Sequence, residues 1–184
     1  ACANLESVNI PSSIRVVGAA PFQYCTSLTT IVVDKTNPIF DSREGCNAII
    51  KTKDNSLIVG CGATKIPSSV RCIDKYAFMG CQAEEFAIPD GVKIINFFAF
   101  SSCPNLKKIV IPASVETIEE LAFDNCPEVI SIVVDKNNTD YDSRNGCDAI
   151  IYTSDNKLIL GCSSTIIPQD IETISAFAFS HCRN

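Results

Sequence analysis

The sequence contains no tryptophan and a single histidine, His181, among its 184 residues. Basic residues are also scarce, because 15 Lys and Arg stand against 21 Asp and Glu, which gives a net charge of -6. Nucleic-acid binding depends on clustered positive charge, and attraction to anionic lipid needs a basic segment. The composition therefore argues against both kinds of partner.

Long apolar segments are missing as well. No run approaches the roughly 20 apolar residues that span a bilayer, and the opening residues ACANLESV have neither the charged start nor the apolar core of a signal peptide. Hydrophobic residues nevertheless make up 46% of the chain and charged residues 20%, which is typical of folded proteins. We expect an ordered chain that has no membrane span.

The sequence also provides little for catalysis. A Ser or Cys nucleophile needs a positioned base, and His181 lies among the last four residues. The carboxylate pairs Glu84 with Glu85 and Glu119 with Glu120 are sequence neighbours at variable positions, which favours solvated faces over an acid pair. We therefore expect no enzymatic activity and no cofactor.

Metal binding is disfavoured by spacing. The eleven cysteines include no Cys-x-x-Cys pair of the kind that zinc sites use. Asp135, Asn137 and Thr139 imitate the start of an EF-hand loop, but Asp140 and Gly146 stand where that loop needs Gly and Glu. The sequence predicts no metal site.

What the sequence does contain is an internal repeat. Each of five Ile-Pro pairs is followed by Phe eleven residues after the proline and by Cys fourteen residues after it. A fixed spacing of this kind predicts a solenoid of stacked coils. The five units are Pro11, Phe22 and Cys25; Pro67, Phe78 and Cys81; Pro89, Phe100 and Cys103; Pro112, Phe123 and Cys126; and Pro168, Phe179 and Cys182.

Each coil is expected to contain two extended pieces and one turn. Val8 with Ile10, and Ile109 with Ile111, alternate at period two, which predicts a short strand that the next proline ends. A second extended piece follows. The Ala-Phe-x-x-Cys step after it is interpreted as one helical or 3₁₀ turn.

Two coils are longer, and their extra residues recur 101 positions apart. From Cys25 to Pro67 and from Cys126 to Pro168 the chain takes 42 residues. The pattern predicts a β-hairpin insert in each, at about 34–65 and about 135–166, within one array over 1–184 that is a fragment of a longer protein. The recurring residues are Asp41, Ser42, Arg43, Cys46 and Cys61, and then Asp142, Ser143, Arg144, Cys147 and Cys162.

The cysteines fall into two groups. Cys2, Cys25, Cys81, Cys103, Cys126 and Cys182 share one repeat position, which a buried thiol fills well. In the inserts, a turn centred between Lys53 and Asp54 would put Cys46 opposite Cys61, with Cα atoms roughly 4.5 to 5.5 Å apart, which suits a disulfide. The same holds for Cys147 and Cys162. A turn centred one residue later would slip the pairing by two residues, so both registers stay open.

Two smaller features have simple interpretations. Cys72 has no counterpart in the other units, and we expect a partly exposed free thiol there. Asp41, Ser42 and Arg43, like their copies, favour a turn with its own hydrogen bonds over a ligand site.

The repeat units also resemble a known family. IPSSVRCIDKYAFMGC, IPDGVKIINFFAFSSC and IPASVETIEELAFDNC are similar to the BspA-like class of leucine-rich repeats, and the Asp-Ser-Arg-x-Gly-Cys insert resembles one that recurs in the same bacterial surface proteins. The resemblance implies a leucine-rich-repeat solenoid of the right-handed β/α superhelix type, with short parallel β-strands, short helical turns and two inserted β-hairpins. It also implies an extracellular or cell-surface protein that takes part in adhesion. Pro21 before Phe22, and the short link from Cys81 to Pro89, depart from the family pattern and affect strand register in two coils.

Binding would use the residues that point outward from the first strand of each coil. Strands about 4.8 Å apart would stack the second outward residue of five coils into an apolar stripe roughly 19 Å long, which is a candidate protein-docking strip. The other interpretation is that these residues only favour strand formation. The outward pairs are Ser7 and Asn9, Thr30 and Val32, Glu85 and Ala87, Lys108 and Val110, and Ser131 and Val133.

These observations lead to a hypothesis of a non-catalytic surface module that binds a protein, either from a host matrix or from another bacterial surface. The alternatives are a spacer that projects another domain and a glycan-binding accessory module.

Overall fold

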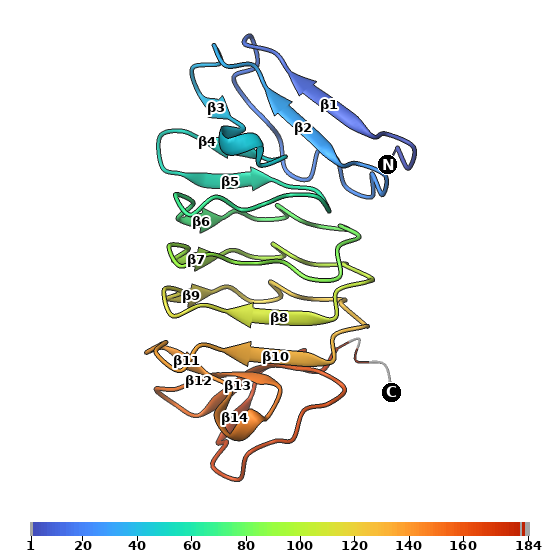
Figure 1. The fold of residues 1–184 in the computed structure, drawn as a ribbon. Coiled ribbons are helices and arrows are strands. Elements are labelled where there is room, and N and C mark those ends of the chain that lie inside the picture. The colour runs from blue at the N-terminus through green and yellow to red at the C-terminus, as the bar shows by residue number, and fades with distance from the viewer. Residues whose placement is uncertain (1, 181, 183–184) are drawn as a thin grey trace.

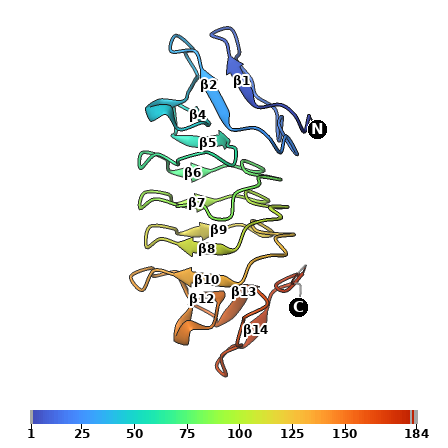
Figure 2. The same cartoon turned by 45° about the vertical axis from the view of Figure 1, so that its right-hand side comes forward.

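The computed structural model describes residues 2–180 and 182, which wind into a column of stacked coils. Figure 1 shows β1 (Ser7–Ile10) near one end of the column and β14 (Thr173–Ile174) near the other. The view turned by 45° shows the same order of coils (Figure 2). The fold is therefore a β-solenoid of stacked parallel coils, as the repeat predicted.

Four coils begin with a strand of four residues, in which more buried and more exposed side chains alternate. In β8 (Lys108–Ile111), Ile109 and Ile111 are buried while Lys108 and Val110 are exposed. Each such strand lies parallel to the strand of a neighbouring coil, in the pairs β1 with β2 (Thr30–Val33) and β8 with β10 (Ser131–Val134). The alternation predicted from the sequence is confirmed in these strands.

The second extended piece of a coil is a strand of two residues. β6 (Cys72–Ile73), β7 (Ile94–Ile95) and β9 (Thr117–Ile118) lie parallel and in register, so that Ile73, Ile95 and Ile118 follow one another through the stack. These strands extend a six-stranded sheet that begins in the first insert.

The turn that follows the second strand forms no helix, so the predicted helical or 3₁₀ turn is not confirmed. Tyr76, Phe98 and Leu121 have φ angles of 62°, 56° and 58°, which lie in the left-handed region and break a helix. The turns bond to one another instead, because the Phe78 N–H donates to the Ala99 carbonyl and the Phe100 N–H to the Ala122 carbonyl, each at 2.7 Å. Among the described residues the helical segments are η1 (Arg43–Gly45) and η2 (Arg144–Gly146), both in the inserts.

Each insert contains an antiparallel hairpin whose last strand joins the solenoid. In the first, β3 (Phe40–Asp41) pairs with β4 (Ile49–Lys51), β4 pairs with β5 (Ser56–Val59), and β5 runs parallel to β6. In the second, β11 (Tyr141–Asp142), β12 (Ala149–Tyr152) and β13 (Lys157–Gly161) lead to β14 in the same way.

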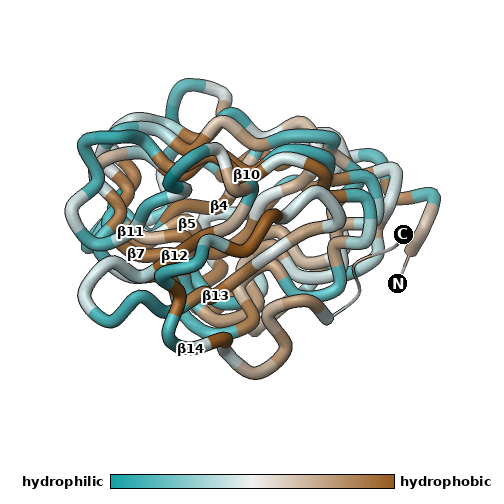
Figure 3. The backbone as a smooth tube through the Cα atoms, turned by 90° about the horizontal axis from the view of Figure 1, so that it is seen from below, coloured by the Kyte–Doolittle hydropathy of each residue, from teal (hydrophilic) through white to brown (hydrophobic). Residues whose placement is uncertain are grey.

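The hairpins cross the interior and divide the core. Ile49 and Ile50 are neighbours on β4 and both are fully buried, yet Ile49 packs with the coils before the insert and Ile50 with the coils after it. The second hairpin separates the central core from the last coil in the same manner. Seen from below, the hydrophobic segments gather in the middle, around β4, β5 and β12 (Figure 3). Each hairpin thus forms a wall, that is, a layer of backbone that separates two hydrophobic cores of the solenoid.

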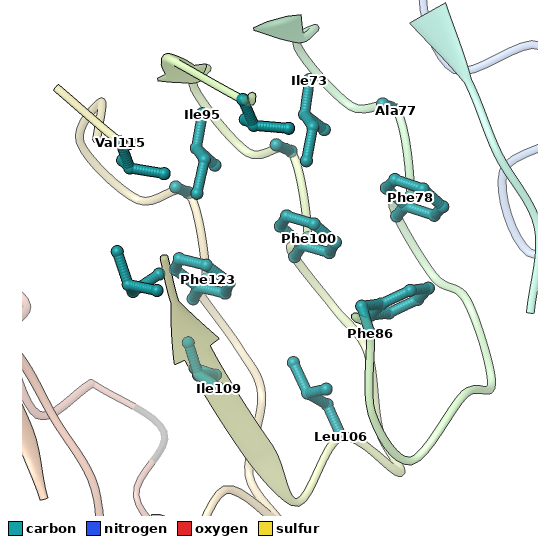
Figure 4. Close-up of a cluster of buried hydrophobic side chains, with 14 of the residues drawn as sticks. Ile73, Ala77, Phe78, Phe86, Ile95, Phe100, Leu106, Ile109, Val115 and Phe123 are labelled. Carbon is teal, nitrogen blue, oxygen red and sulfur yellow. The ribbon is translucent and has the colours of Figure 1, made fainter. Parts of the chain in front are cut away.

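A column of aromatic rings runs through the central core. Phe78, Phe100 and Phe123 come from successive turns and stack face to face, with ring centroids 5.0 and 5.1 Å apart and interplanar angles of 1° and 2°. Phe86 contacts the first two rings at 4.6 and 5.0 Å. Figure 4 shows the three parallel rings with Phe86 beside them. The phenylalanine of each repeat therefore packs its ring against the phenylalanine ring of the next coil.

Glycine ends this column where a hairpin joins it. The Gly60 N–H donates to the Ala77 carbonyl at 2.8 Å. In the regular coils the N–H of the repeat phenylalanine makes this bond to the alanine carbonyl of the next coil. A Cβ atom on Gly60 would lie 2.2 Å from Cε1 of Phe78, and one on Gly161 would lie 2.2 Å from Cε1 of Phe179. The neighbouring ring thus fills the space of the missing side chain, which explains why both inserts have glycine here.

Replacing Gly60 with alanine is therefore expected to lower the free energy of unfolding by about 1 to 3 kcal/mol, because overpacking forces the Phe78 ring out of its stack. Urea denaturation followed by circular dichroism measures the loss. Gly18→Ala is the matched control, since a Cβ there meets nothing within 4 Å. Equal stability of the two variants would mean that the ring does not occupy this space.

Candidate functional site

The outward residues of the first strands are exposed, as their alternation predicted. Ser7, Asn9, Thr30, Val32, Glu85, Ala87, Lys108, Val110 and Val133 are exposed, and Ser131 is half-buried. Val32, Val110 and Val133 are 45%, 38% and 42% exposed, which are high values for valine.

These residues do not form one continuous stripe, so that prediction was wrong. Asn9 and Val32 lie on the β1–β2 sheet, while Val110 and Val133 lie on a separate β8–β10 sheet. Between them, Glu85 makes only an isolated bridge with Lys108, and Ala87 lies outside any strand. The first insert separates the two sheets because residues 34–66 take up the intervening coil.

What remains is a compact patch, which we call the β8–β10 face: Lys108, Val110, Ser131 and Val133. The parallel register puts Lys108 beside Ser131 and Val110 beside Val133, so the two exposed valines are direct cross-strand neighbours. Near this patch, Lys107 and Glu84 form an exposed ion pair at 3.0 Å. The face thus combines an apolar centre with a charged border, which is the usual make-up of a protein interface.

The insert cysteines are free thiols, so the candidate disulfides are absent. The hairpin turn is centred as one predicted register required, with Lys51 opposite Ser56, but a bulge between Ile49 and Ile50 then shifts the pairing. Cys46 packs in the central core and Cys61 in the core before the insert. Cys147 and Cys162 are likewise in different cores. In each insert the hairpin lies between the two cores and so keeps the two cysteines apart.

The repeat cysteines are less buried than predicted. Cys103 is buried, Cys25, Cys81, Cys126 and Cys182 are half-buried, and Cys2 is exposed. The thiols form a ladder between turns, because Cys103 donates to the Phe78 carbonyl at 3.3 Å and Cys126 to the Phe100 carbonyl at 3.2 Å. Burial raises the pKa of the Cys81 thiol to about 12, which leaves the nucleophilic thiolate form very scarce at neutral pH.

Cys72 is half-buried, in agreement with the prediction of a partly exposed free thiol. Burial, assisted by the negative charge of Asp74, raises the pKa of its thiol to about 11. Its chemistry is therefore unsuited to nucleophilic catalysis at neutral pH.

The Asp-Ser-Arg segments are engaged in their own turn. Arg43 donates to both carboxylate oxygens of Asp41, at 2.8 and 2.6 Å, and to the Asn55 side chain at 2.8 Å. The Ser42 hydroxyl accepts from the Val33 N–H at 2.9 Å. Asp142, Ser143 and Arg144 repeat these bonds in the second insert. The interpretation as a hydrogen-bonded turn is confirmed.

Sequence reasoning missed a structural asparagine in each insert. Asn37 is 8% exposed and makes four hydrogen bonds: its amide donates to the carbonyls of Pro11 and Ile14, and its oxygen accepts from the N–H groups of Ile39 and Phe40. Asn138 makes the corresponding four. The sequence signal that could have revealed these residues is that both inserts have asparagine at the same position.

The described residues bring together no group of three or more His, Cys, Asp or Glu side chains that could hold a metal ion. Within the same residues, no helix is long and apolar enough to cross a membrane. Glu84, Glu85, Glu119 and Glu120 are exposed, as expected. His181 lies outside the described residues.

Solved structures with similar folds include a leucine-rich repeat protein. The pneumococcal vaccine antigen PcpA matches 72% of the chain at 20% identity with a TM-score of 0.50, and the match takes in 40% of that protein. A leucine-rich repeat protein from Eubacterium ventriosum matches 71% of the chain at 19% identity with a TM-score of 0.58, over 36% of its own length. A leucine rich cell surface protein from Faecalibacterium prausnitzii matches 70% of the chain at 27% identity, with a TM-score of 0.42 and 29% of its own length covered.

The chain thus spans less than half the length of each of these proteins, and the first two likenesses support the fold alone. No curated protein gave a significant match. The model of the BspA type leucine rich repeat region, however, matches in six copies over residues 1–47 and 60–147. Since these residues make up well over half of the chain, the protein belongs to the BspA type leucine-rich repeat family.

Proposed function

We propose that this chain is a non-catalytic, protein-binding module of a bacterial cell-surface or secreted protein, and that the β8–β10 face makes the contact. The observation that carries the proposal is the pair Val110 and Val133, exposed and directly adjacent on neighbouring strands. Family membership supports the bacterial surface location. A host matrix protein or another bacterial surface protein would be the partner.

Apolar surface that is exposed to water carries a free-energy cost. Burying such surface gains about 25 cal/mol per Å², and the two valines present theirs from a hydrogen-bonded sheet that loses little freedom on binding. Lys108 and Ser131 beside them supply polar groups that fix orientation. A rigid apolar centre of this kind is where binding energy concentrates in protein interfaces.

The double variant Val110→Glu/Val133→Glu is expected to weaken binding at least tenfold, because each carboxylate loses its water in the interface. Binding to immobilised fibronectin, laminin and collagen, and to a glycan array, is measured by surface plasmon resonance. Thermal unfolding should change little, since both side chains point to solvent.

Val32→Glu is the matched control, because Val32 holds the same repeat position on the separate β1–β2 sheet and is 45% exposed. Loss of binding in both variants would remove the assignment to the β8–β10 face. Binding to no probe, together with retained function when the repeats are replaced by an unrelated rod, would favour the spacer. Binding to glycans alone would favour an accessory module.

A further inference from the structure

Each insert leaves a gap in the outer row of turns. In a regular coil, eight positions separate Ile73 of the second strand from Cys81, and this segment forms the outer turn. In the insert coil only four positions separate Leu57, which pairs with Ile73, from Cys61. The outer turn is therefore missing at this level, and a notch opens between the turn before and the turn after it.

The two notches are copies of each other. The first has a volume of about 510 Å³ and the second about 500 Å³, and corresponding residues line them, such as Val17 with Ile118 and Ile58 with Ile159. Away from the lining of the first notch, a side-chain contact links the two flanking turns, because Gln23 donates to the Met79 sulfur at 3.2 Å. Clefts of this volume accommodate small ligands and short peptide segments.

The walls of the two notches have diverged in charge. The first is lined by three cations, Arg15, Lys51 and Lys75, and one carboxylate, Asp74. In the second copy Glu116, Tyr152 and Ala176 occupy the positions of the three cations. The second notch is instead lined by Glu120, Asp155 and Lys157. A cationic notch on a chain of net charge -6 is a local departure from the rest of the surface.

The cations come from three different parts of the fold. Arg15 belongs to the first coil, Lys51 to the hairpin and Lys75 to the turn after β6. Lys51 has only a long ion pair with Asp54, at 3.6 Å and half exposed, which contributes little. Asp74 already accepts hydrogen bonds from the Lys75 N–H at 2.7 Å and from Asn96 at 3.3 Å. The two lysine ammonium groups thus remain available to an anion, whereas Arg15 already donates through Nη1 to the Ser12 and Ile14 carbonyls and can offer only its other N–H groups.

Aliphatic side chains form the rest of the lining. Val16 is 82% exposed, and Val17, Ile39 and Ile58 are half-buried. Among the described residues, the one aromatic side chain that lines this notch is Phe40, which is only 4% exposed and so offers no free ring face on which a sugar could stack. The lining of the notch therefore suits a ligand that has an apolar side chain flanked by carboxylates.

We propose that the first notch binds an acidic peptide segment, with an apolar side chain against Val16, Ile39 and Ile58 and carboxylates on Lys51, Lys75 and Arg15. This site is distinct from the β8–β10 face and goes beyond the function proposed above. It uses charge complementarity for its specificity.

The test uses a fluorescently labelled peptide, Glu-Leu-Glu-Glu-Leu-Glu, and fluorescence anisotropy with the whole chain. Saturable binding is expected to weaken at least tenfold in the double variant Lys51→Tyr/Lys75→Ala and severalfold at high salt, because exposed charges are screened. The two substitutions introduce the residues that the second notch already contains, where Tyr141 and Tyr152 pack with ring centroids 5.5 Å apart. The variant should therefore fold, and a thermal melt checks it.

Comparisons among peptides, variants and a second ligand decide the outcome. Replacing every Glu of the peptide with Gln, or both Leu with Ser, should weaken binding at least fivefold. Equal binding by the wild type and the double variant, or by the Glu and Gln peptides, overturns the proposal. Stronger binding of a heparin-derived hexasaccharide at the same residues would overturn the peptide assignment. Val110→Glu/Val133→Glu should bind the peptide normally, so failure of either proposal is recognised separately.

Discussion

Replacing Phe100 with alanine is expected to lower the free energy of unfolding by about 3 to 5 kcal/mol, the usual cost of removing a buried phenylalanine side chain. Phe100 is fully buried and stacks on Phe78 on one side and Phe123 on the other. Its loss would leave a cavity in the ring column and remove both stacking contacts and the contact with Phe86. Urea denaturation followed by circular dichroism measures the effect.

The effect should also spread along the column. In a solenoid each coil is stabilised mainly by its neighbours, so the transition of the variant is expected to broaden as the two halves uncouple. Phe177→Ala is the control, because Phe177 is 68% exposed and its truncation should cost below about 1 kcal/mol. A loss of that small size for Phe100 would show that the ring column does not bear the stability of the coils.

Replacing Asn37 with alanine is expected to cost about 2 to 4 kcal/mol. The side chain satisfies two carbonyls of the first coil and two N–H groups of the first insert at once. Buried polar groups that lose their partner cost about 1 to 3 kcal/mol each, and water can reach only some of them. Differential scanning calorimetry would show a lower melting temperature.

Two further variants separate the hydrogen bonds from general disturbance of the loop. Asn37→Asp keeps an acceptor for the Ile39 and Phe40 N–H groups but removes the donors to Pro11 and Ile14, so an intermediate loss is expected. Thr36→Ala, at the exposed neighbouring residue, should cost below about 1 kcal/mol. If all three variants were equally stable, the asparagine would not be the clamp between coil and insert.

The strands and their faces could be predicted because their signals are local. Ile109 and Ile111 alternate with Lys108 and Val110, and a period of two puts successive side chains on opposite faces whatever the neighbours are. The proline that follows ends the strand for an equally local reason, since it has no N–H to donate. The hairpin turn between Lys51 and Ser56 was predicted in one of two registers for the same kind of reason.

The turns could not be predicted from local pattern. The Ala-Phe-x-x-Cys step looks like one helical turn, but Phe98 takes a φ of 56° because its neighbours Ala99 and Phe100 bond to the adjacent coils. Hydrogen bonds between coils satisfy the backbone there, and such bonds depend on the stack and not on the segment.

In the candidate site, too, some features followed from the local sequence and others only from how the coils stack. The exposure of Val110 and Val133 followed from alternation, but the break between Val32 and Ala87 followed from where the first insert lies. The notch was invisible to sequence reasoning, because Arg15, Lys51 and Lys75 are distant in sequence and meet only after folding.

By itself the sequence determined the repeat, the duplicated inserts, the first strands and the family, since each of these is written in residues at fixed spacing. Only the tertiary structure decided that the inserts are walls through the core, that Cys46 and Cys61 face different sides of one wall, and that Gly60 leaves room for Phe78. These outcomes depend on which surfaces pack together, and packing joins residues whose separation along the chain carries no signal of their contact.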